Sequence, residues 1–429
     1  MKSKFNKSNS LFKKVVSIVP TASQTFSKSY LQYIKEVAPL FAVRGRGSHL
    51  WDIDGNEYID LVSGLAAISL GYQYPAIDKA IKNQLKKGIV FSLASSLEYE
   101  LALLLKKHIP CAEMVRFGKN GSDVTTAAIR LVRAVTGRDH IAVGGYHGWH
   151  DWSIGTTTRN LGIPEATRAL SHKFTFNDIS SLEKIFKEYS KSIAAVILEP
   201  ATYEAPSPGF LAAVKKITHR YGALLIFDEV ASGWKTSLGG AQALYKVTPD
   251  LATFGKAMSN GMPISAVVGK AKYMKKMEDI FFSFTAGGEC LSLAAAIATI
   301  KVMEKEKFPS VIKQKALYLK KNLDRLIKKN NLGDTVIIVG IVPWQSVLVS
   351  SSNGFAAIEI KSYIQQELLE KNILWIGNHI LNLSHTKKDL DTVINAYGCI
   401  FKKLKEFLDK KTLRKNLKGD PITDIFKIR

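Results

Sequence analysis

The sequence predicts an α/β protein with a large domain built on a mostly parallel sheet and a smaller α+β domain formed by both termini. In the middle of the chain, short apolar runs alternate with helical patterns, which is typical of strand–helix–strand crossovers. Both ends show hairpin and helix patterns instead. We therefore expect residues 76–310 to form the large domain, and residues 1–75 and 311–429 to form the small one.

Five apolar runs have the length of strands and are bounded by turns: Ile141–Gly145, Ala194–Leu198, Ala223–Phe227, Leu251–Phe254 and Ile264–Val268. Helical spacing of apolar residues predicts helices at Val124–Val135, Leu182–Lys191 and Gly209–His219. The run Ala223–Phe227 is apolar throughout, which indicates a strand that is buried on both faces of a parallel sheet.

The two ends of the chain give different patterns. Leu50–Asp60 alternates around an Asp-Gly-Asn turn, which predicts an antiparallel hairpin. A short surface helix is expected at Ser10–Ile18. Toward the other end, helices are expected from about Cys290 to Lys305 and at Lys315–Lys329, followed by strand in Val336–Ser350.

The composition indicates an ordinary globular protein. Hydrophobic residues make up 46% of the 429 residues and charged residues 23%. The net charge of +23 raises the question of an acidic partner, but the basic residues are spread along the chain without a recognisable nucleic-acid module. We therefore expect a solvated lysine-rich surface and no nucleic-acid partner.

The sequence also bears on location. No apolar run reaches the roughly 18 residues of a membrane helix, so no membrane partner is expected. The three cysteines form no close pair, which favours a reducing compartment. The N-terminus is basic and Ser-rich like a transit peptide, but it has no Arg before Arg44. We expect a cytoplasmic protein.

Four motifs contain the residues of chemical interest, and the first is a glycine turn. Phe117–Asp123 leads directly into the helix predicted after it, with Asn120, Gly121 and Ser122 at its start. Free backbone N–H groups and the positive end of the helix dipole suit a phosphate there. The alternative is that Ser122 or Asp123 only caps the helix.

The second motif places acid at the end of a strand. Asp228 and Glu229 follow the apolar run Ile226–Phe227, at the carboxyl edge of the sheet where α/β proteins bind ligands. One of the two carboxylates is suited to holding a proton on a heterocyclic nitrogen. A metal site or a structural ion pair is the competing interpretation.

The third and fourth motifs add a lysine and aromatic rings. Lys256 comes directly after a strand, and apolar neighbours would lower its pKa toward nucleophilic use, although most lysines are surface charges. Gly145–Trp152 contains Tyr146 and Trp149, whose rings suit stacking on a flat ligand. His147, His150 and Asp151 lack further residues at ligand spacing, so no metal is expected.

A phosphate cradle, an acid for a ring nitrogen, a nucleophilic lysine and a stacking aromatic residue together describe a pyridoxal 5'-phosphate (PLP) site. The chain also resembles the class III aminotransferases of fold type I over nearly its whole length. The most specific segments are Val115–Phe117, Ala128–Ala134 and Thr136–Asp139.

The resemblance implies a large domain with a mostly parallel seven-stranded sheet and a role for each site residue. Lys256, Asp228 and Tyr146 would be catalytic: Lys256 forms the Schiff base, Asp228 contacts the pyridine nitrogen and Tyr146 stacks on the ring. Val230 would pack on the other face. The full set of expected cofactor-binding residues is Asn120, Gly121, Ser122, Tyr146, His147, Glu199, Asp228, Val230, Lys256 and Thr285. Thr285 would come from the second subunit of a homodimer.

Three segments depart from the family pattern. Relatives commonly read Asn-Ser-Gly-Thr-Glu at the phosphate turn, where this chain has Lys119–Asp123. Lys235 stands where the family often has Arg, which exchanges a planar fork for a point charge. The stretch Trp152–Pro164 replaces a longer glycine-rich gating loop found in the related aminomutases.

We expect an aminotransferase that moves an amino group from a small-molecule donor, such as glutamate, to a carbonyl acceptor. Trp149, Trp152 and Trp234 fall in segments near the expected site, and indole packs well on a sugar face. A keto sugar is therefore an expected acceptor, with Trp149 and Arg159 as candidate substrate contacts. The alternative function is intramolecular amino transfer on glutamate 1-semialdehyde, as in glutamate-1-semialdehyde 2,1-aminomutases.

Overall fold

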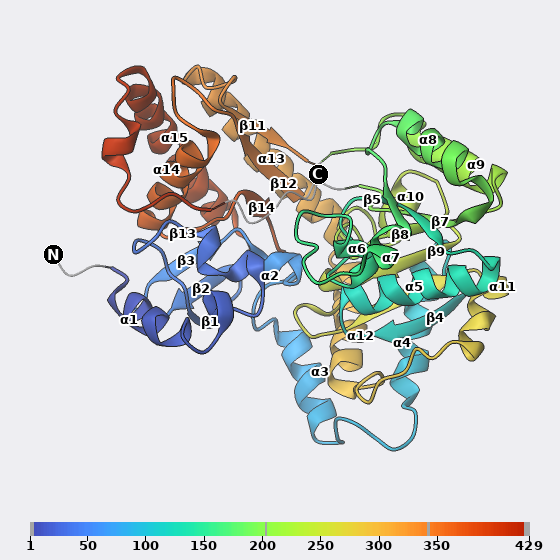
Figure 1. Ribbon diagram of the computed structural model, residues 1–429. Helices are drawn as coiled ribbons and strands as arrows, with labels where there is room; N and C mark the ends of the chain where they lie inside the picture. Colours follow the sequence, from blue (N-terminus) through green and yellow to red (C-terminus); the bar gives the residue numbers. More distant parts are fainter. Residues whose placement is uncertain (1–3, 202–203, 341–343, 424–429) are drawn as a thin grey trace. The chain divides into compact units, whose positions relative to one another are not determined.

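The computed structural model describes residues 4–201, 204–340 and 344–423 (Figure 1). They form two compact units. Among the described residues, one unit comprises residues 75–310, and the other combines residues 4–74 with those from 311 to 423. Within the described ranges, no helix is both long enough and apolar enough to cross a membrane.

A seven-stranded mixed sheet is the centre of the unit at 75–310. Its strands are β4 (Met114–Gly118), β5 (His140–Gly144), β6 (Ser171–Lys173), β7 (Ile193–Leu198), β8 (Leu224–Asp228), β9 (Leu251–Phe254) and β10 (Ser265–Gly269). Their order is β4-β10-β9-β8-β7-β5-β6. Only β10 runs antiparallel to its neighbours, β4 and β9. The expected mostly parallel seven-stranded sheet is confirmed.

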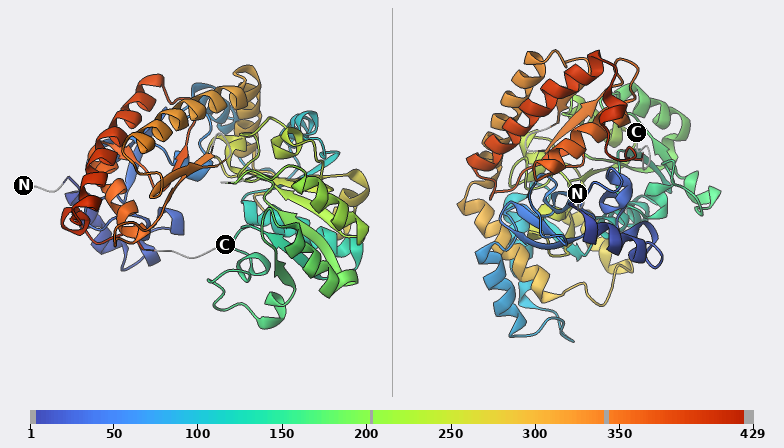
Figure 2. Two further views of the ribbon diagram at one scale, coloured as in Figure 1. Left: turned by 90° about the horizontal axis from the view of Figure 1, so that it is seen from above. Right: turned by 90° about the vertical axis from the view of Figure 1, so that its left-hand side faces the viewer.

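The central strands are buried because helices cover both faces of this sheet (Figures 1 and 2). All six residues of β7 are buried. Ala195 and Ile197 pack in a core with Val124 and Leu131 of the helix α5 (Gly121–Thr136), while Val196 and Leu198 point to the opposite face and are equally buried. Strands with two covered faces need apolar side chains at every position.

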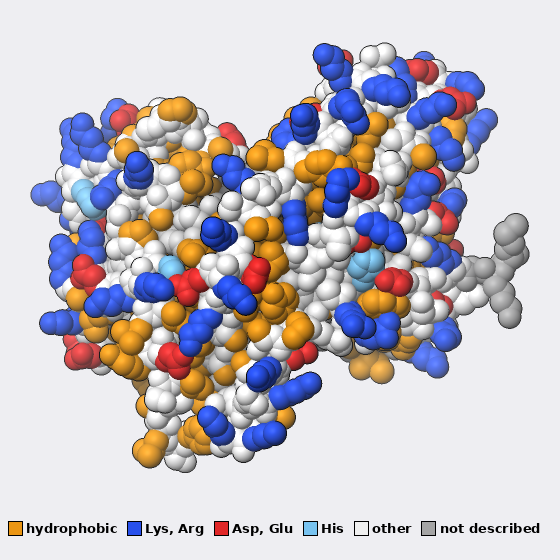
Figure 3. Space-filling model, turned by 180° about the vertical axis from the view of Figure 1, so that it is seen from behind, with side chains coloured by type: hydrophobic (Ala, Val, Ile, Leu, Met, Phe, Trp, Pro, Cys, Tyr) orange, Lys and Arg blue, Asp and Glu red, His pale blue; other side chains and the backbone are white. Residues whose placement is uncertain are grey.

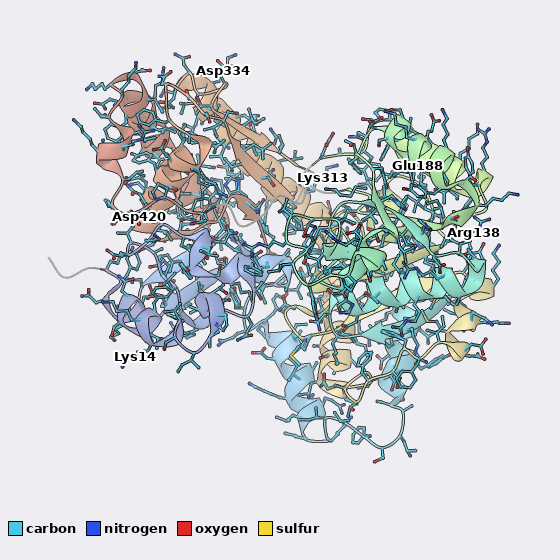
Figure 4. The ribbon with its side chains drawn as sticks, viewed as in Figure 1. Lys14, Arg138, Glu188, Lys313, Asp334 and Asp420 are labelled. Carbon is cyan, nitrogen blue, oxygen red and sulfur yellow. The ribbon has the colours of Figure 1, made fainter. Side chains whose placement is uncertain are left out.

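The helices of this unit are α3 (Pro75–Leu85), α4 (Ser96–His108), α5 (Gly121–Thr136), α6 (Asp151–Ile154), α7 (Glu165–Arg168), α8 (Ile179–Tyr189), α9 (Phe210–Arg220), α10 (Gly240–Leu244), α11 (Ala271–Met274) and α12 (Cys290–Lys305). The helices predicted at Val124–Val135, Leu182–Lys191 and Gly209–His219 correspond to α5, α8 and α9 with ends that differ by one to three residues, and the helix predicted at Cys290–Lys305 matches α12. After α5, Arg138 (labelled in Figure 4) donates to the carbonyl oxygens of Ile193 and Tyr221 at 3.0 and 2.8 Å. Arg138 thereby links the end of α5 to the first residue of β7 and to the segment that precedes β8.

The other unit contains two smaller sheets. One has the order β1 (Ala42–Arg46), β2 (His49–Asp52), β3 (Glu57–Asp60) and β13 (Ile373–Leu374), and the other the order β11 (Val336–Val339), β12 (Trp344–Val349) and β14 (Asn378–Ile380). The helices are α1 (Asn6–Val15), α2 (Ser63–Ala66), α13 (Phe308–Lys329), α14 (Ala357–Glu370) and α15 (Lys387–Asp409). The pairing of β2 with β3 is antiparallel, which confirms the predicted hairpin. Part of the predicted strand Val336–Ser350, residues 341–343, lies outside the described residues.

The first helix begins earlier than its local sequence predicts. It spans Asn6–Val15 rather than Ser10–Ile18. The backbone N–H groups of Lys7 and Ser8 donate to the carboxylate of Asp54 at 2.7 and 2.9 Å. A carboxylate from the hairpin turn thus caps this helix, and local sequence reasoning cannot detect a cap that lies so far along the chain.

Charged side chains are spread over the surface rather than gathered in one patch. On the face drawn in Figure 3, Lys and Arg side chains are spread over both units, with Asp and Glu side chains among them. Several lysines form ion pairs with a carboxylate one helical turn away, such as Lys405 with Asp409 at 2.6 Å. This arrangement is that of a solvated helix surface.

Candidate active site

The residues of chemical interest meet at the carboxyl edge of the seven-stranded sheet. Asp228 is the last residue of β8, and Lys256 lies two residues beyond the end of the neighbouring strand, β9. Because β8 and β9 are parallel, with Asp228 opposite Thr253, the two segments leave the sheet on the same side. The electrostatic influence of Asp228 reaches the Lys256 amine.

Three donors hold the carboxylate of Asp228. His147 Nδ1 lies 2.7 Å from Oδ2. The Val230 backbone N–H and the Thr253 hydroxyl donate to Oδ1 at 3.0 and 3.1 Å. Asp228 is buried, so these bonds fix the plane of the carboxyl group and supply partners for a charge that water does not reach.

His147 is itself locked in place. Its ring is buried and lies nearly parallel to the indole of Trp152, with 6.1 Å between ring centroids. Its carbonyl oxygen accepts a hydrogen bond of 2.8 Å from Thr125 in α5. The other ring nitrogen, Nε2, is buried without a hydrogen-bond partner among the described residues. With Nδ1 directed at a carboxylate, the neutral ring carries its proton on Nδ1.

Lys256 begins a short 3₁₀ turn, Lys256–Ser259, with a positive φ of 43°. A left-handed backbone is uncommon for a lysine and marks a position held by its surroundings. Burial lowers the pKa of the Lys256 amine, while the charges of Glu199 and Asp228 act in the opposite direction. The net lowering favours the unprotonated amine, which is the nucleophilic form.

A second buried lysine shares this region. Lys235 is buried, and its Nζ donates to the carbonyl oxygen of Ala231 at 3.0 Å. Burial and the charge of Lys256 lower the pKa of Lys235 to about 7. The family often has Arg at this position. Here the position is occupied by the Lys235 amine, whose protonation state depends on its surroundings.

Tyr146 and Glu199 lie at the same edge of the sheet. Tyr146 follows β5 and is partly exposed, and its backbone N–H donates to Glu199 Oε2 at 3.3 Å. Burial, followed by the negative charges of Asp228 and Glu199, raises the pKa of the Tyr146 phenol. The ring thus remains a neutral, flat surface at the opening of the site.

The glycine turn lies against these residues. Gly121 and Ser122 open α5, and the backbone N–H groups of Lys119 and Asn120 donate to the Asp123 carboxylate at 3.0 and 2.7 Å. A Cβ on Gly121 would lie 3.0 Å from Val230 Cγ1. That distance is shorter than an ordinary van der Waals contact, so glycine suits this close approach between the helix start and the strand end.

The loop after β5 packs onto the same turn. The Trp149 backbone N–H donates to Ser122 Oγ at 3.2 Å, and a Cβ on Gly148 would lie 2.2 Å from that oxygen. The structure therefore gathers nine of the ten expected cofactor-binding residues around one edge of the sheet: Asn120, Gly121, Ser122, Tyr146, His147, Glu199, Asp228, Val230 and Lys256.

The other expected residues, Thr285, Trp149 and Arg159, are exposed and lie outside this group. Thr285 is exposed in the segment between the 3₁₀ turn at Lys275–Asp279 and α12. Trp149 is 68% exposed, and Arg159 is exposed in the loop after α6.

Two of the three tryptophans considered for sugar stacking are in the interior. Trp152 donates to the Thr126 hydroxyl at 2.8 Å, and Trp234 is fully buried against Phe254 and His108. The expectation that they border a substrate is wrong, because each fills space between secondary-structure elements.

Sequence reasoning missed Thr253, the hydroxyl donor to Asp228. The available signal was a single polar residue in the otherwise apolar run Leu251–Phe254. In a parallel sheet a residue in register with an acid lies beside it, and the observed register pairs Asp228 with Thr253. A buried threonine on the strand next to that acid was therefore a candidate donor.

These residues fit PLP. The N–H groups at the start of α5 suit a phosphate, the buried carboxylate of Asp228 suits a protonated ring nitrogen, and the Lys256 amine suits an aldehyde carbon. The close approaches at Gly121 and Gly148 shape the turn without filling it with side chains.

Comparison with known proteins decides the family. The sequence profile of the family described as "Aminotransferase class-III" matches residues 32–342. The chain belongs to the class III aminotransferases. Members of this family depend on PLP, so the expected enzyme class and cofactor are both confirmed.

Two sequence relatives illustrate the range of this class III family. The 3-aminobutyryl-CoA aminotransferase of Cloacimonas acidaminovorans (strain Evry) is 36% identical over 406 residues, covering 92% of this chain and 96% of the relative. A glutamate-1-semialdehyde 2,1-aminomutase of Desulfitobacterium hafniense (strain DSM 10664 / DCB-2) is 34% identical over 393 residues, covering 85% and 91%.

Solved structures agree with this class III assignment. The FumI protein of Sphingopyxis sp. MTA144, described in its PLP internal aldimine form, has a TM-score of 0.88 at 25% identity and covers 97% of this chain and 99% of its own. A β-phenylalanine aminotransferase from Variovorax paradoxus has a TM-score of 0.81 at 25% identity, with 92% and 93% covered.

Proposed function

We propose that this class III aminotransferase uses Lys256, Asp228 and Tyr146 as its catalytic residues. The observation that supports this most strongly is the placement of the Lys256 amine and the buried Asp228 carboxylate at the ends of adjacent parallel strands. When bound, PLP supplies an electron sink for the carbon that bears the amino group.

Asp228 would hold a proton on the ring nitrogen of the cofactor. Its Oδ2 is bonded to His147 and its Oδ1 to Val230 and Thr253, so the carboxyl group cannot rotate freely. A fixed carboxylate in a water-excluded site acts strongly on a neighbouring positive charge. His147 is a positioning residue in this scheme, because it acts through Asp228.

Lys256 would hold the cofactor through its amine, and the same amine would move a proton at the substrate carbon that bears the amino group. Burial lowers the pKa of this amine, which favours the unprotonated form that can accept a proton. Tyr146, whose phenol stays neutral, stacks on the ring. Val230, which adjoins Gly121, covers the other face.

The start of α5 holds the phosphate. Gly121 and Ser122 present backbone N–H groups of the first helical turn, and the Ser122 hydroxyl lies at the same point. Asn120 precedes them, and its carbonyl oxygen accepts a hydrogen bond of 2.7 Å from Ser265. Thr285 of a second subunit would complete this phosphate site.

A homodimer is part of the proposal. Exposed apolar side chains crowd the connection from α3 into α4, namely Ile89, Val90, Phe91, Leu93 and Tyr99. The Cys290 backbone N–H donates to the Ile89 carbonyl oxygen at 2.8 Å, so this apolar stretch adjoins the segment that contains Thr285. A contiguous exposed apolar patch of this kind is typical of a subunit interface. Mass measurement at low concentration tests this, and an active monomer would contradict it.

The cytoplasm is the proposed location. All three cysteines are free, with Cys111 and Cys290 buried and Cys399 exposed, as is usual in a reducing compartment.

We infer that the substrate amine lies on the carbon β to a carboxyl or thioester group. Two relatives are named for such compounds, 3-aminobutyryl-CoA and β-phenylalanine. A keto sugar loses most of its structural support, because only Trp149 of the three tryptophans is exposed.

The deciding experiment is an absorbance titration of the purified PLP-loaded enzyme against amines. β-Amino acids should convert the lysine-bound spectrum to that of the amino form of the cofactor, with amino sugars much weaker. Conversion only by amino sugars would restore the keto-sugar acceptor.

The second candidate function is the aminomutase reaction, which relatives at 34% identity perform by name. The two functions differ in their need for an external amino donor. Efficient conversion of glutamate 1-semialdehyde to 5-aminolevulinate without added donor would establish the aminomutase and exclude the intermolecular reaction.

A further inference from the structure

The segment that contains Thr285 contacts the phosphate turn and also the strand and the helix on either side of that turn. Three cations, one each from β4, α5 and the turn between them, contact the segment at residues 281–289. Arg116 in β4 donates to the Phe282 carbonyl oxygen at 2.9 Å, and Arg130 in α5 donates to that of Phe281 at 2.8 Å. The third cation is Lys119, in the turn itself, and its partner is a side chain.

The third contact is an ion pair of unusual burial for this chain. Lys119 Nζ lies 3.0 Å from Glu289 Oε2, and the two side chains are only 14% and 13% exposed. Many other lysine–carboxylate pairs here are far more exposed, such as Lys301 with Glu100 at 57% and 45%. An ion pair sheltered from water is screened less and holds its geometry more tightly than a surface pair.

Glu289 has a second function in the same place. It precedes α12, and its Oε1 accepts from the Leu291 backbone N–H at 2.6 Å, while Oε2 accepts from the Ser292 hydroxyl at 2.5 Å. Burial opposes ionisation, but the Ser292 hydroxyl and Lys119 together lower the pKa of Glu289. One ionised carboxylate thus fixes both the start of α12 and the end of the segment that contains Thr285.

We propose that the Lys119–Glu289 pair is a positioning device that holds the Thr285 segment of one subunit for the phosphate site of the other. This rests on the homodimer of the proposed function. Lys119 stands within its own subunit's phosphate turn, yet its charge is directed at Glu289, four residues beyond Thr285. Its effect on cofactor binding therefore appears in the partner's site.

The first test measures the affinity of the apoenzyme for PLP, followed by the visible absorbance of the lysine-bound cofactor. Lys119→Met and Glu289→Gln should each weaken binding about 10-fold, since each breaks a sheltered charge pair. Glu289→Gln keeps an acceptor for the start of α12. The double variant should be no weaker than either single variant, because both remove one interaction.

Two further variants serve as controls. Lys119→Arg should restore most of the affinity, because it keeps a cation within reach of Glu289. Lys301→Met removes an exposed pair and should leave affinity unchanged. Additive losses in the double variant would contradict a single shared interaction and overturn the proposal.

The second test separates action on the partner from action within one subunit. A mixed dimer is prepared from a Lys119→Met subunit and a Lys256→Ala subunit, so that only the first gives the lysine-bound absorbance. The Thr285 segment serving that site then comes from a subunit with an intact Lys119–Glu289 pair. Affinity close to that of the wild type is the expected result.

The possible failures are distinct. A mixed dimer that binds as weakly as the Lys119→Met homodimer shows that Lys119 acts within its own subunit, which overturns this inference and leaves the homodimer intact. A protein that is monomeric at all working concentrations removes the homodimer itself, and the inference with it.

Discussion

His147 Nδ1 lies 2.7 Å from Asp228 Oδ2, and both side chains are almost entirely shielded from solvent. The sequence places these residues 81 positions apart, in the loop after β5 and at the end of β8. Their bond joins the aromatic loop to the acid that we propose for the cofactor's ring nitrogen.

The contribution of His147 can be separated from that of Asp228. Asp228→Asn should retain cofactor but slow amino transfer by about 10²- to 10³-fold, because a neutral amide cannot balance a pyridinium charge. His147→Leu should slow it roughly 10-fold, and His147→Asn, which keeps a donor, should slow it less. In the Asp228→Asn background His147→Leu should have little further effect. Full additivity in single-turnover rates would mean that His147 acts independently of Asp228.

Lys256→Ala should abolish the visible absorbance of lysine-bound cofactor and reduce transfer by at least about 10³-fold. Lys256→Arg should fail equally, because a guanidinium stays protonated and forms no bond with the aldehyde. The control is Lys272→Ala, which changes an exposed lysine after β10 and should behave as the wild type. A Lys256→Ala enzyme with the unchanged spectrum would show that another lysine binds the cofactor.

Gly148→Ala should weaken cofactor binding, because the added methyl group would lie 2.2 Å from Ser122 Oγ and push the loop away from the phosphate turn. We expect a loss of about 10-fold in affinity, equivalent to about 1.4 kcal/mol. Gly162→Ala is a matched control, since Gly162 also has a positive φ but nothing lies within 4 Å of its added Cβ. Equal losses in the two variants, measured by PLP titration, would attribute the effect to backbone strain alone.

The unit that contains both termini should lose stability in mild acid. Burial lowers the pKa of His379 to about 3 and that of His385 to about 4, below the ordinary value of 6.5. The unfolded chain then binds more protons than the folded one as the pH falls below 6.5, so stability decreases toward the folded-state values. At pH 5 each histidine should account for about 2 kcal/mol.

Urea unfolding at pH 7 and pH 5 measures this loss. His379→Gln and His385→Gln should each flatten the dependence, even where they lower stability at pH 7. If the wild type and the double variant lose the same free energy of unfolding between these pH values, the histidines are not responsible.

Periodicity predicted the large sheet well because its strands are buried on both faces. Leu251–Phe254 matches β9 residue for residue, and Ala194–Leu198 differs from β7 by one residue. The same local reasoning misplaced α1, whose start depends on a cap by Asp54 from a distant turn.

The residues of the candidate site also divide into those that the local sequence predicts and those that it does not. Lys256, Asp228 and the glycine turn were predictable because each lies at or just beyond the carboxyl end of a strand. The tryptophans were not, since nothing in the local sequence distinguishes Trp234, which is buried, from Trp149, which is exposed. The bond between Thr253 and Asp228 required the strand order, which residue periodicity alone does not give.

The single reversed strand, β10, has a consequence for how this site tolerates change. Because β4 and β9 are both antiparallel to β10, they are parallel to each other, and the phosphate turn emerges on the same edge as Lys256 and Asp228. With about 4.8 Å between neighbouring strands, the turn's strand lies about 10 Å from that of Lys256, and Asp228's strand about 5 Å to its other side. These lateral distances are set by main-chain hydrogen bonds, so substitutions in the apolar core leave the dimension of the site unchanged. A sheet with these fixed spacings can diverge widely in sequence and still bind a ligand of one fixed length.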